Sequence, residues 1–278
     1  MTLTPLLSSL EQARFEIIPV KGVDEQIDHL PPGAVVTVTA SPTKGLDPTL
    51  ELARELVARG HRVVPHLSAR LVQSRDHLAA VLADLEARGI IEVFVPAGDI
   101  EQPLGPYEGA ADLLEDMTLL GHRLEHVGIT GYPERHAFIP DQTTIDAMTR
   151  KAPHATHIVS QICYDPAVVR GWITAVRDRG VGLPLFLGVP GVIDRARLLR
   201  VSMRVGLGDS VRFLRKQHEV AGRMLTGYQP DELIHALEDL VGHPEVRVAG
   251  WHLFTFNEVE RTELWRQELM ARLRRRAG

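Results

Sequence analysis

Short runs of β-branched and apolar residues alternate with longer segments of helical periodicity along the whole of this 278-residue chain. This alternation is typical of repeated strand and helix units around a parallel sheet. Eight strands are predicted, at residues 14–18, 34–39, 61–65, 90–95, 123–128, 156–160, 183–188 and 246–254. Helices are predicted near residues 22–30, 47–59, 74–88, 108–121, 141–152, 165–179, 194–205 and 257–274, with further helical segments at 209–224 and 230–241. Eight such pairs in a chain of this length predict a (β/α)8 TIM barrel, with extra helices before the last strand.

Residues that cap helices support these boundaries. Asp47, Ser74 and Asp165 each precede a predicted helix, as N-capping residues do. A basic residue followed by glycine, at 59–60, 88–89 and 179–180, ends three helices with a residue suited to the left-handed conformation. No break in composition marks a boundary, so residues 1–278 are expected to form one catalytic barrel domain. A doubly wound open sheet is the alternative, but no glycine-rich phosphate fingerprint follows the first strand.

Composition excludes several classes of protein. A net charge near -5 with mixed signs offers no general basic surface for nucleic acid or an anionic membrane. The arginines at 272, 274, 275 and 276 are interpreted as a solvated helix end. The single Cys163 excludes an internal disulfide and any site with several cysteines. No run reaches the roughly 18 apolar residues of a membrane span, and no targeting segment is recognised, so a cytoplasmic location is expected.

Glu16 is the most informative single residue. It lies in the first predicted strand, in Arg14-Phe15-Glu16-Ile17-Ile18, where apolar side chains are expected. Burying an ionised carboxylate costs on the order of several kcal/mol unless the group is paired or becomes protonated. Glu16 is therefore a candidate catalytic acid, and a salt bridge to an arginine is the structural alternative.

Polar residues follow most of the other strands. In a TIM barrel the active site forms at the carboxyl ends of the strands and in the loops after them. The residues there are Glu16, Thr39, Ser41, His66, Asp99, Tyr132, Glu134, His136, Gln161, Thr255 and Asn257.

Several of these residues also have structural interpretations. Asp99 follows Pro96-Ala97-Gly98 and is equally suited to a turn or helix cap. His66 fits a hydrogen-bonded core histidine, and Asn257 fits the N-cap of the last helix. Gln161 must be paired if it is buried, either with the protein or with a ligand.

Motifs for other chemistries are absent or weak. The thirteen histidines show no His-Glu-x-x-His spacing, so no catalytic metal is predicted. No nucleophile elbow, P-loop or EF-hand loop occurs. Gly206-Leu207-Gly208-Asp209-Ser210 has the form of a phosphate-binding helix start, although such a segment is more often a simple cap.

Seven short motifs, taken in order, resemble the methylenetetrahydrofolate reductase family over almost the whole chain. They are Phe15-Glu16-x-x-Pro19, Val36-Thr37-Val38-Thr39, Pro65-His66-Leu67-Ser68, Gly98-Asp99, Tyr132-Pro133-Glu134-x-His136, Gln161 and His252-Leu253-Phe254-Thr255-x-Asn257. The resemblance implies a (β/α)8 barrel that reduces 5,10-methylenetetrahydrofolate to 5-methyltetrahydrofolate, in one-carbon metabolism and methionine biosynthesis. It also implies that Glu16 is the acid and that Asp99 and Gln161 contact the pterin.

The residue types suit this chemistry. Opening the five-membered ring of the folate requires a proton on the departing nitrogen, which a carboxylic acid kept neutral near pH 7 supplies. The carboxylate of Asp99 accepts from the amino-pyrimidinone edge of a pterin, and the amide of Gln161 both donates and accepts.

Two departures concern the hydride donor. Members of the family that hold FAD usually show Arg-Gly-Asp where this chain has Ala97-Gly98-Asp99, and the first strand here lacks the usual aromatic residues. The resemblance still places family flavin contacts at Thr39, His66, Tyr107, Tyr132, His136 and Arg150. We therefore expect a flavin-independent member that takes hydride directly from NADH or NADPH, with bound FAD as the competing interpretation.

Other classes remain open from the sequence. A phosphate-binding isomerase or aldolase requires a phosphate site at 206–210 or a Schiff-base lysine. The lysines, which are Lys21, Lys44, Lys151 and Lys216, all fall outside the predicted strands. A barrel that binds a tetrahydropterin or deazaflavin without turnover is the non-enzyme alternative. The expected partners are a reduced folate and a nicotinamide nucleotide, and a homo-oligomer is compatible with the sequence.

Overall fold

The computed structural model describes residues 4–134, 141–194, 197 and 230–277. Its strands are β1 (Arg14–Ile17), β2 (Val35–Val38), β3 (Arg62–Pro65), β4 (Glu92–Val95), β5 (His126–Gly131), β6 (His157–Ser160), β7 (Leu185–Pro190) and β8 (Val248–Phe254). Its helices are α1 (Pro5–Glu11), α2 (Val23–Ile27), α3 (Asp47–Ala58), α4 (Arg75–Ala87), α5 (Ala110–Leu120), α6 (Asp141–Lys151), α7 (Pro166–Asp178), α10 (Asp231–Leu237) and α11 (Val259–Ala277), with 3-10 turns η1 (Ala69–Leu71), η2 (Ala152–His154) and η3 (Glu238–Leu240).

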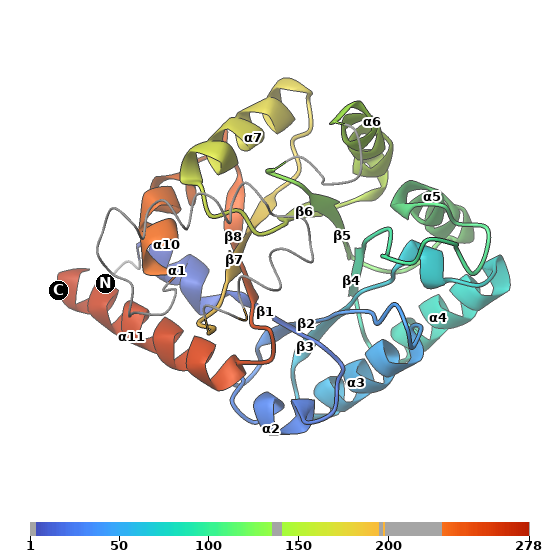
Figure 1. Ribbon diagram of the computed structural model, residues 1–278, viewed down its shortest axis with the longest axis horizontal. Coiled ribbons are helices and arrows are strands. Elements are labelled where there is room, and N and C mark those ends of the chain that lie inside the picture. Colours follow the sequence, from blue (N-terminus) through green and yellow to red (C-terminus); the bar gives the residue numbers. More distant parts are fainter. Residues whose placement is uncertain (1–3, 135–140, 195–196, 198–229, 278) are drawn as a thin grey trace.

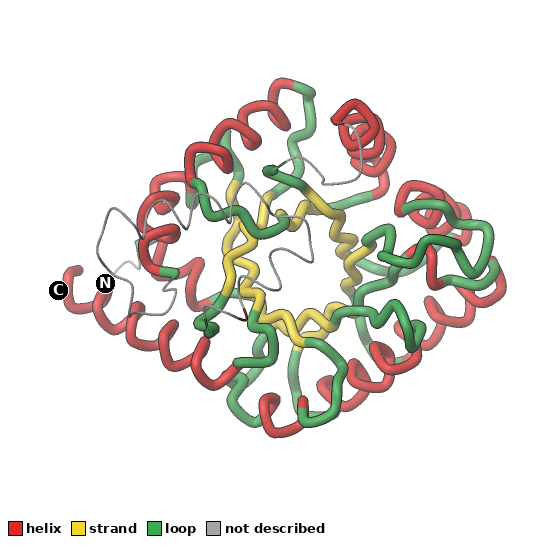
Figure 2. The backbone as a smooth tube through the Cα atoms, viewed as in Figure 1, coloured by secondary structure: helices red, strands yellow, loops and turns green. Residues whose placement is uncertain are grey.

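The strands form one parallel sheet in the order β3-β2-β1-β8-β7-β6-β5-β4. This sheet curls into a nearly closed ring with the helices outside it (Figures 1 and 2). The two end strands, β3 and β4, meet through a bridge between His66 and Phe94, where Leu67 N–H donates to the Phe94 carbonyl at 2.8 Å. The predicted (β/α)8 barrel is confirmed.

Most of the predicted helix ends are also confirmed. Ser74 Oγ accepts the N–H of His77 at 3.0 Å, and Asp165 Oδ1 accepts the N–H of Ala167 at 2.8 Å. The glycines at 60, 89 and 180 have φ angles of 84°, 68° and 77°, in the left-handed region that glycine tolerates. Asp47 differs, because α3 starts at this residue and no side-chain cap bond forms there.

One strand lies later than predicted, one helix was not predicted, and two predicted helices fall mostly outside the described residues. β5 runs from His126 to Gly131, three residues later than predicted, and its two glycines explain the error because glycine weakens a strand pattern. Helix α1 was not predicted. It packs against α11 and β8, where Trp251 Nε1 donates to Ser9 Oγ at 2.8 Å. The helices predicted at 194–205 and 209–224 fall mostly outside the described residues.

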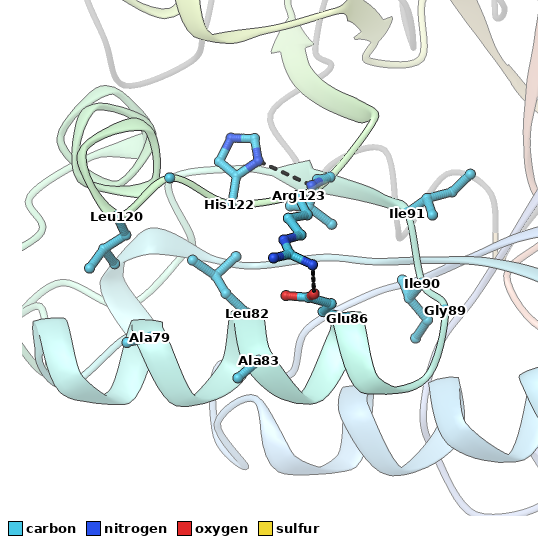
Figure 3. A pocket seen from close by; sticks show the side chains of 12 residues that line it. Ala79, Leu82, Ala83, Glu86, Gly89, Ile90, Ile91, Leu120, His122 and Arg123 are labelled. Atoms are coloured by element: carbon cyan, nitrogen blue, oxygen red, sulfur yellow. Dashed lines mark hydrogen bonds and ion pairs between the residues drawn. The ribbon is translucent and has the colours of Figure 1, made fainter.

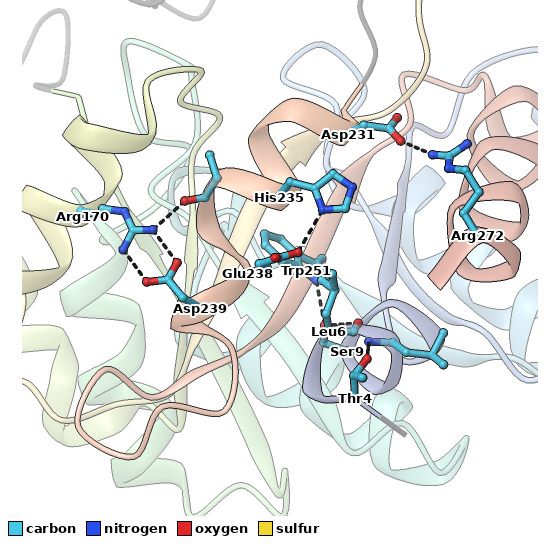
Figure 4. Close-up of polar contacts among 12 residues, drawn as sticks. Thr4, Leu6, Ser9, Arg170, Asp231, His235, Glu238, Asp239, Trp251 and Arg272 are labelled. Atoms are coloured by element: carbon cyan, nitrogen blue, oxygen red, sulfur yellow. Dashed lines mark hydrogen bonds and ion pairs between the residues drawn. The ribbon is translucent and has the colours of Figure 1, made fainter. Parts of the chain in front are cut away.

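The extra helical segment before β8 is present as α10 and η3, which bridge α7 and α11 (Figure 4). Asp239 accepts a hydrogen bond from Arg170 of α7 at 2.9 Å. On the other side, Asp231 pairs with Arg272 of α11. These contacts hold the segment against the outside of the barrel.

The main apolar core lies between the barrel and the helices. Alternate residues of each strand point into it, so Phe15 and Ile17 of β1 are 1% and 0% exposed. A smaller apolar cluster of Val64, Phe94 and Val159 fills part of the barrel interior. Polar side chains, among them Glu16, His66 and His252, lie beside the aromatic rings in the remaining interior, and they form the candidate site. No helix in the described ranges combines the length and apolar character needed to cross a bilayer.

Candidate active site

Glu16 points into the barrel because it alternates along β1 with Phe15 and Ile17, which face the helices. Its Oε2 lies 3.1 Å from Nε2 of His252 on β8 and 3.7 Å from Nε2 of His66, which follows β3. The Glu16 side chain is 15% exposed, whereas those of His66 and His252 are 8% and 2% exposed. The predicted apolar surroundings of Glu16 are therefore wrong: two imidazoles face its carboxyl group inside the barrel.

Burial lowers the pKa of His66 to about 4, although Glu16 partly opposes the shift. His66 is therefore neutral at pH 7, and its approach to Glu16 is not an ion pair. Its ring instead packs on Phe94 with centroids 4.7 Å apart. Three buried polar atoms in this region have no hydrogen-bond partner among the described residues: His66 Nε2, His252 Nδ1 and Thr37 Oγ1. Thr37 is paired in register with Glu16.

A second polar layer lies one pleat below Glu16. Arg14 pairs with Glu92 of β4, and its guanidinium lies 3.7 Å from the centroid of the Phe186 ring. His157 Nε2 lies 3.2 Å from Arg14 and 3.3 Å from Glu92. Burial, reinforced by the charge of Arg14, lowers the pKa of His157 to about 3. Arg14 and Glu92 therefore form a buried charged layer below the candidate acid, Glu16.

Two residues after β8 hold the end of β1 in place. Thr255 Oγ1 donates to the carbonyl oxygen of Glu16. Asn257 accepts from Ile18 N–H at 2.8 Å and donates to the Ile18 carbonyl at 2.9 Å. The predicted N-cap role of Asn257 is wrong, because α11 begins at Val259, whose N–H is capped by Gln26 Oε1 at 2.9 Å.

Asp99 is exposed in the loop after β4, and Tyr132 directly follows β5. Burial and the negative charge of Asp99 raise the pKa of Tyr132, while a hydrogen bond with Thr130 opposes this shift. Lys151 Nζ donates to both Oγ1 and the carbonyl of Thr130, at 3.1 and 3.2 Å. A polar group at the β4 and β5 side of the barrel is thus formed by Asp99, Thr130, Tyr132 and Lys151.

Gln161 and Thr39 lie at the same end of the barrel, after β6 and β2, and both are half-buried. Gln161 Oε1 accepts the N–H of Ile162 at 2.9 Å. This leaves its side-chain NH2 group as a donor. The backbone carbonyl of Thr39 accepts a hydrogen bond from the Thr49 hydroxyl at 2.8 Å. The Thr39 hydroxyl takes no part in this contact.

Other predicted contacts are not brought to this group. The Tyr107 hydroxyl donates to Asp116 of α5 at 2.7 Å. Arg150 pairs with Asp112 and Glu115 of the same helix, at 3.1 and 2.7 Å, on an exposed surface. His136 and the Gly206–Ser210 segment lie outside the described residues.

His252 is the main residue that the sequence reasoning did not assign. A signal was present, because His252 belongs to the same motif as Thr255 and Asn257 at the end of the last predicted strand. The direction of its side chain could not be inferred. Lys151 was considered only as a Schiff-base lysine.

A hollow of about 230 Å³ lies away from this end, between α4 and the segments before β4 and β5 (Figure 3). It is lined by apolar side chains such as Leu82 and Ile91 and closed at one side by the Arg123 to Glu86 pair at 2.9 Å. Within the described part of the chain, no cluster of three or more histidine, cysteine or acidic residues is arranged to hold a metal ion.

No protein-family model matches the chain. Among solved structures, it is similar to an uncharacterized protein from Clostridium thermocellum that binds two copies of 5-methyl-5,6,7,8-tetrahydrofolic acid, with a TM-score of 0.60 and 11% identity over 95% of this chain and 98% of that chain. A dihydropteroate synthase from Thermus thermophilus aligns with a TM-score of 0.47 and 11% identity, over 97% of this chain and 95% of that chain. At this identity, the first of these likenesses shows the shared fold.

Proposed function

We propose that this chain is a reductase that converts 5,10-methylenetetrahydrofolate to 5-methyltetrahydrofolate with hydride from NAD(P)H. The observation that carries the proposal is a carboxyl group, Glu16, held by a buried imidazole inside the barrel near the strand ends. Such a group is suited to giving one proton to a bound substrate. The Clostridium thermocellum protein with a similar fold binds a methylated tetrahydrofolate, which is the product class of this reaction.

In the proposed reaction, Glu16 gives its proton to N10 of the folate as the bond between the methylene carbon and N10 breaks. The electron pair of that bond stays on N10, and the methylene carbon becomes part of an iminium with N5. Hydride from the dihydronicotinamide then adds to this carbon and forms the methyl group. The next turnover requires a proton from solvent, and the 15% exposure of Glu16 is consistent with reprotonation before substrate covers it.

Asp99 and Gln161 are proposed to orient the pterin. Asp99 is exposed and offers carboxylate oxygens to the N–H groups of an amino-pyrimidinone. The free NH2 group of Gln161 suits the pterin carbonyl, because its Oε1 is already engaged by Ile162. The two residues follow β4 and β6, so they address one ring from different sides of the barrel opening.

The nicotinamide is proposed to lie near Thr39 and His66. Both residues belong to the β2 and β3 side, next to Glu16, and His66 contributes an imidazole that is neutral at pH 7. FAD in the same position is the alternative within this function. The Arg150 and Tyr107 side chains do not support a flavin site here, because α5 residues already bind them.

A visible spectrum of the purified protein, followed by assays with NADH and NADPH, tests the proposal. We expect a colourless protein that forms 5-methyltetrahydrofolate with one of the two donors. A yellow protein with flavin absorbance would overturn direct hydride transfer, and a melting shift with folate but no product would indicate a binding protein.

Glu16→Gln tests the acid separately. The variant should lose turnover by at least about a hundredfold while it keeps folate affinity and thermal stability. Asp99→Asn is the matched variant, because it should weaken folate binding more than the chemical step. If Glu16→Gln retains full turnover, Glu16 is not the acid.

The aldolase alternative gains no support from the described residues. Lys21 and Lys44 are exposed, and Lys151 is buried against Thr130. Lys216 lies outside the described residues. Borohydride trapping with a sugar phosphate tests this alternative, and we expect it to leave Lys21, Lys44 and Lys151 unmodified.

A further inference from the structure

The two oxygens of the Glu16 carboxyl group have different surroundings. Oε2 lies 3.1 Å from His252 Nε2, within hydrogen-bond distance. Oε1 has no hydrogen-bond partner among the side chains and backbone groups that the structure describes. It is therefore the oxygen that remains available to a bound substrate.

The other ring nitrogen of His252 favours one tautomer over the other. Nδ1 is buried and has no partner in the described part of the chain. If the proton were on Nδ1, a buried N–H donor would be left unpaired, and an unpaired buried donor is the rarer and less favourable arrangement. If the proton is on Nε2, it is donated to Oε2 of Glu16 and only an acceptor is left unpaired.

We propose that His252 is a positioning residue for Glu16: as the Nε2–H tautomer it donates to Oε2, so that Oε1 is the oxygen left to pass the proton to the substrate. This inference rests on the proposed function, and it explains how the acid is directed toward substrate. In the opposite tautomer, Glu16 would donate its proton to His252 instead of to the folate. The imidazole thus decides which oxygen is left to pass the proton to the substrate.

The surroundings of His252 fix this geometry. Its ring contacts Phe254 edge to face, with centroids 4.7 Å apart. Phe254 is paired in register with Glu16, and Thr255 binds the Glu16 carbonyl. Both partners of the hydrogen bond are therefore held by the same two strands.

His66 cannot replace His252 in this role. Its Nε2 is 3.7 Å from Oε2, beyond hydrogen-bond distance, and its ring packs against Phe94. His66 contributes a neutral wall beside the carboxyl group. The hydrogen bond that orients Glu16 comes from β8.

Nitrogen-15 NMR of the histidine rings at pH 7 tests the tautomer directly. The His252 signals, assigned by their loss in His252→Gln, should show a protonated Nε2 and an unprotonated Nδ1. A protonated Nδ1 would overturn the inference. This spectrum decides the tautomer even if the wild-type protein reduces no folate, so failure of the proposed function is distinguishable from failure of the inference.

Two substitutions test the role in turnover. The amide nitrogen of glutamine can reach the position of Nε2, whereas that of asparagine reaches only the position of Nδ1. We expect His252→Asn to lower kcat by about tenfold to a hundredfold with little change in KM, and His252→Gln to remain within a few-fold of wild type. Equal losses in the two variants would contradict the positioning role.

His235→Gln is the control for the general effect of removing a histidine. His235 is on α10, where its Nδ1 contacts Glu238 at 2.9 Å, away from the barrel interior (Figure 4). This variant should keep wild-type kcat. Melting temperatures of all variants separate lost turnover from lost folding.

Discussion

Asn257 binds both backbone groups of Ile18, accepting from its N–H at 2.8 Å and donating to its carbonyl at 2.9 Å. Asn257 itself has a φ of 58°, in the left-handed region that asparagine tolerates better than most residues. The side chain therefore joins the loop after β8 to the end of β1, two residues from Glu16. This contact positions the candidate acid relative to the rest of the site.

Two substitutions separate the hydrogen bonds from the backbone conformation. Asn257→Gly removes the bonds but tolerates the φ angle, so the free energy of unfolding should fall by about 1–3 kcal/mol. Asn257→Ala also places a Cβ-bearing residue in the left-handed region, so its free energy of unfolding should be lower than that of Asn257→Gly by roughly 1 kcal/mol. Urea titrations measure both values, and equal losses would show that backbone strain contributes nothing at this position.

The buried pair of Arg14 and Glu92 gives a second prediction. Glu92→Gln leaves the guanidinium without its charged partner inside the barrel, which should reduce the free energy of unfolding by about 3–5 kcal/mol. Replacing both residues, as in Arg14→Met with Glu92→Leu, should be much less destabilising than the sum of the single changes. Additive effects in this double-mutant cycle would mean that the two side chains do not act as a pair.

His66 makes stability depend on acid pH. Because its pKa falls from 6.5 to about 4 in the folded state, the unfolded chain binds a proton between these values that the folded chain does not. The free energy of unfolding should therefore decrease as pH falls from 6.5 to 4, with His66 contributing about 3 kcal/mol of the change. In His66→Gln this contribution should be absent. Urea titrations at pH 7 and pH 4.5 measure it, and an unchanged pH dependence in the variant would refute the assignment.

The fold could be predicted because strand runs, capping residues such as Ser74 and glycines such as Gly60 each produce a local signal. The shift of β5 shows the limit of that signal. Position 128 must be glycine for the His157 ring to fit inside the barrel, because a Cβ there would lie only 2.6 Å from His157 Nε2. A glycine selected for close packing weakens the strand pattern, so the strand was predicted to end at Gly128 instead of Gly131.

The site could be predicted only in part, for a related physical reason. Glu16 was noticed because it is out of place in an apolar run. The direction of its side chain and its contacts with His66 and His252 depend on how β3 and β8 are placed around the barrel. These residues are far apart in the sequence, and local patterns do not describe such contacts.

Lys151 gives the last prediction, at alkaline pH. It is 5% exposed, and burial lowers its pKa from 10.5 to about 8. Below pH 8 both the folded and the unfolded chain carry the proton; between about 8 and 10.5 the unfolded chain keeps it while the folded chain releases it. The free energy of unfolding should therefore rise with pH over this window, by about 3 kcal/mol relative to Lys151→Met, which cannot titrate.

Lys44→Met is the matched control, because Lys44 is exposed. Because this variant keeps Lys151, its free energy of unfolding should rise with pH as that of the wild type does. Urea titrations of the three proteins at several pH values over this range measure the differences. Parallel curves for wild type and Lys151→Met would mean that the ammonium group is solvated, and that its contact with Thr130 does not keep it buried in solution.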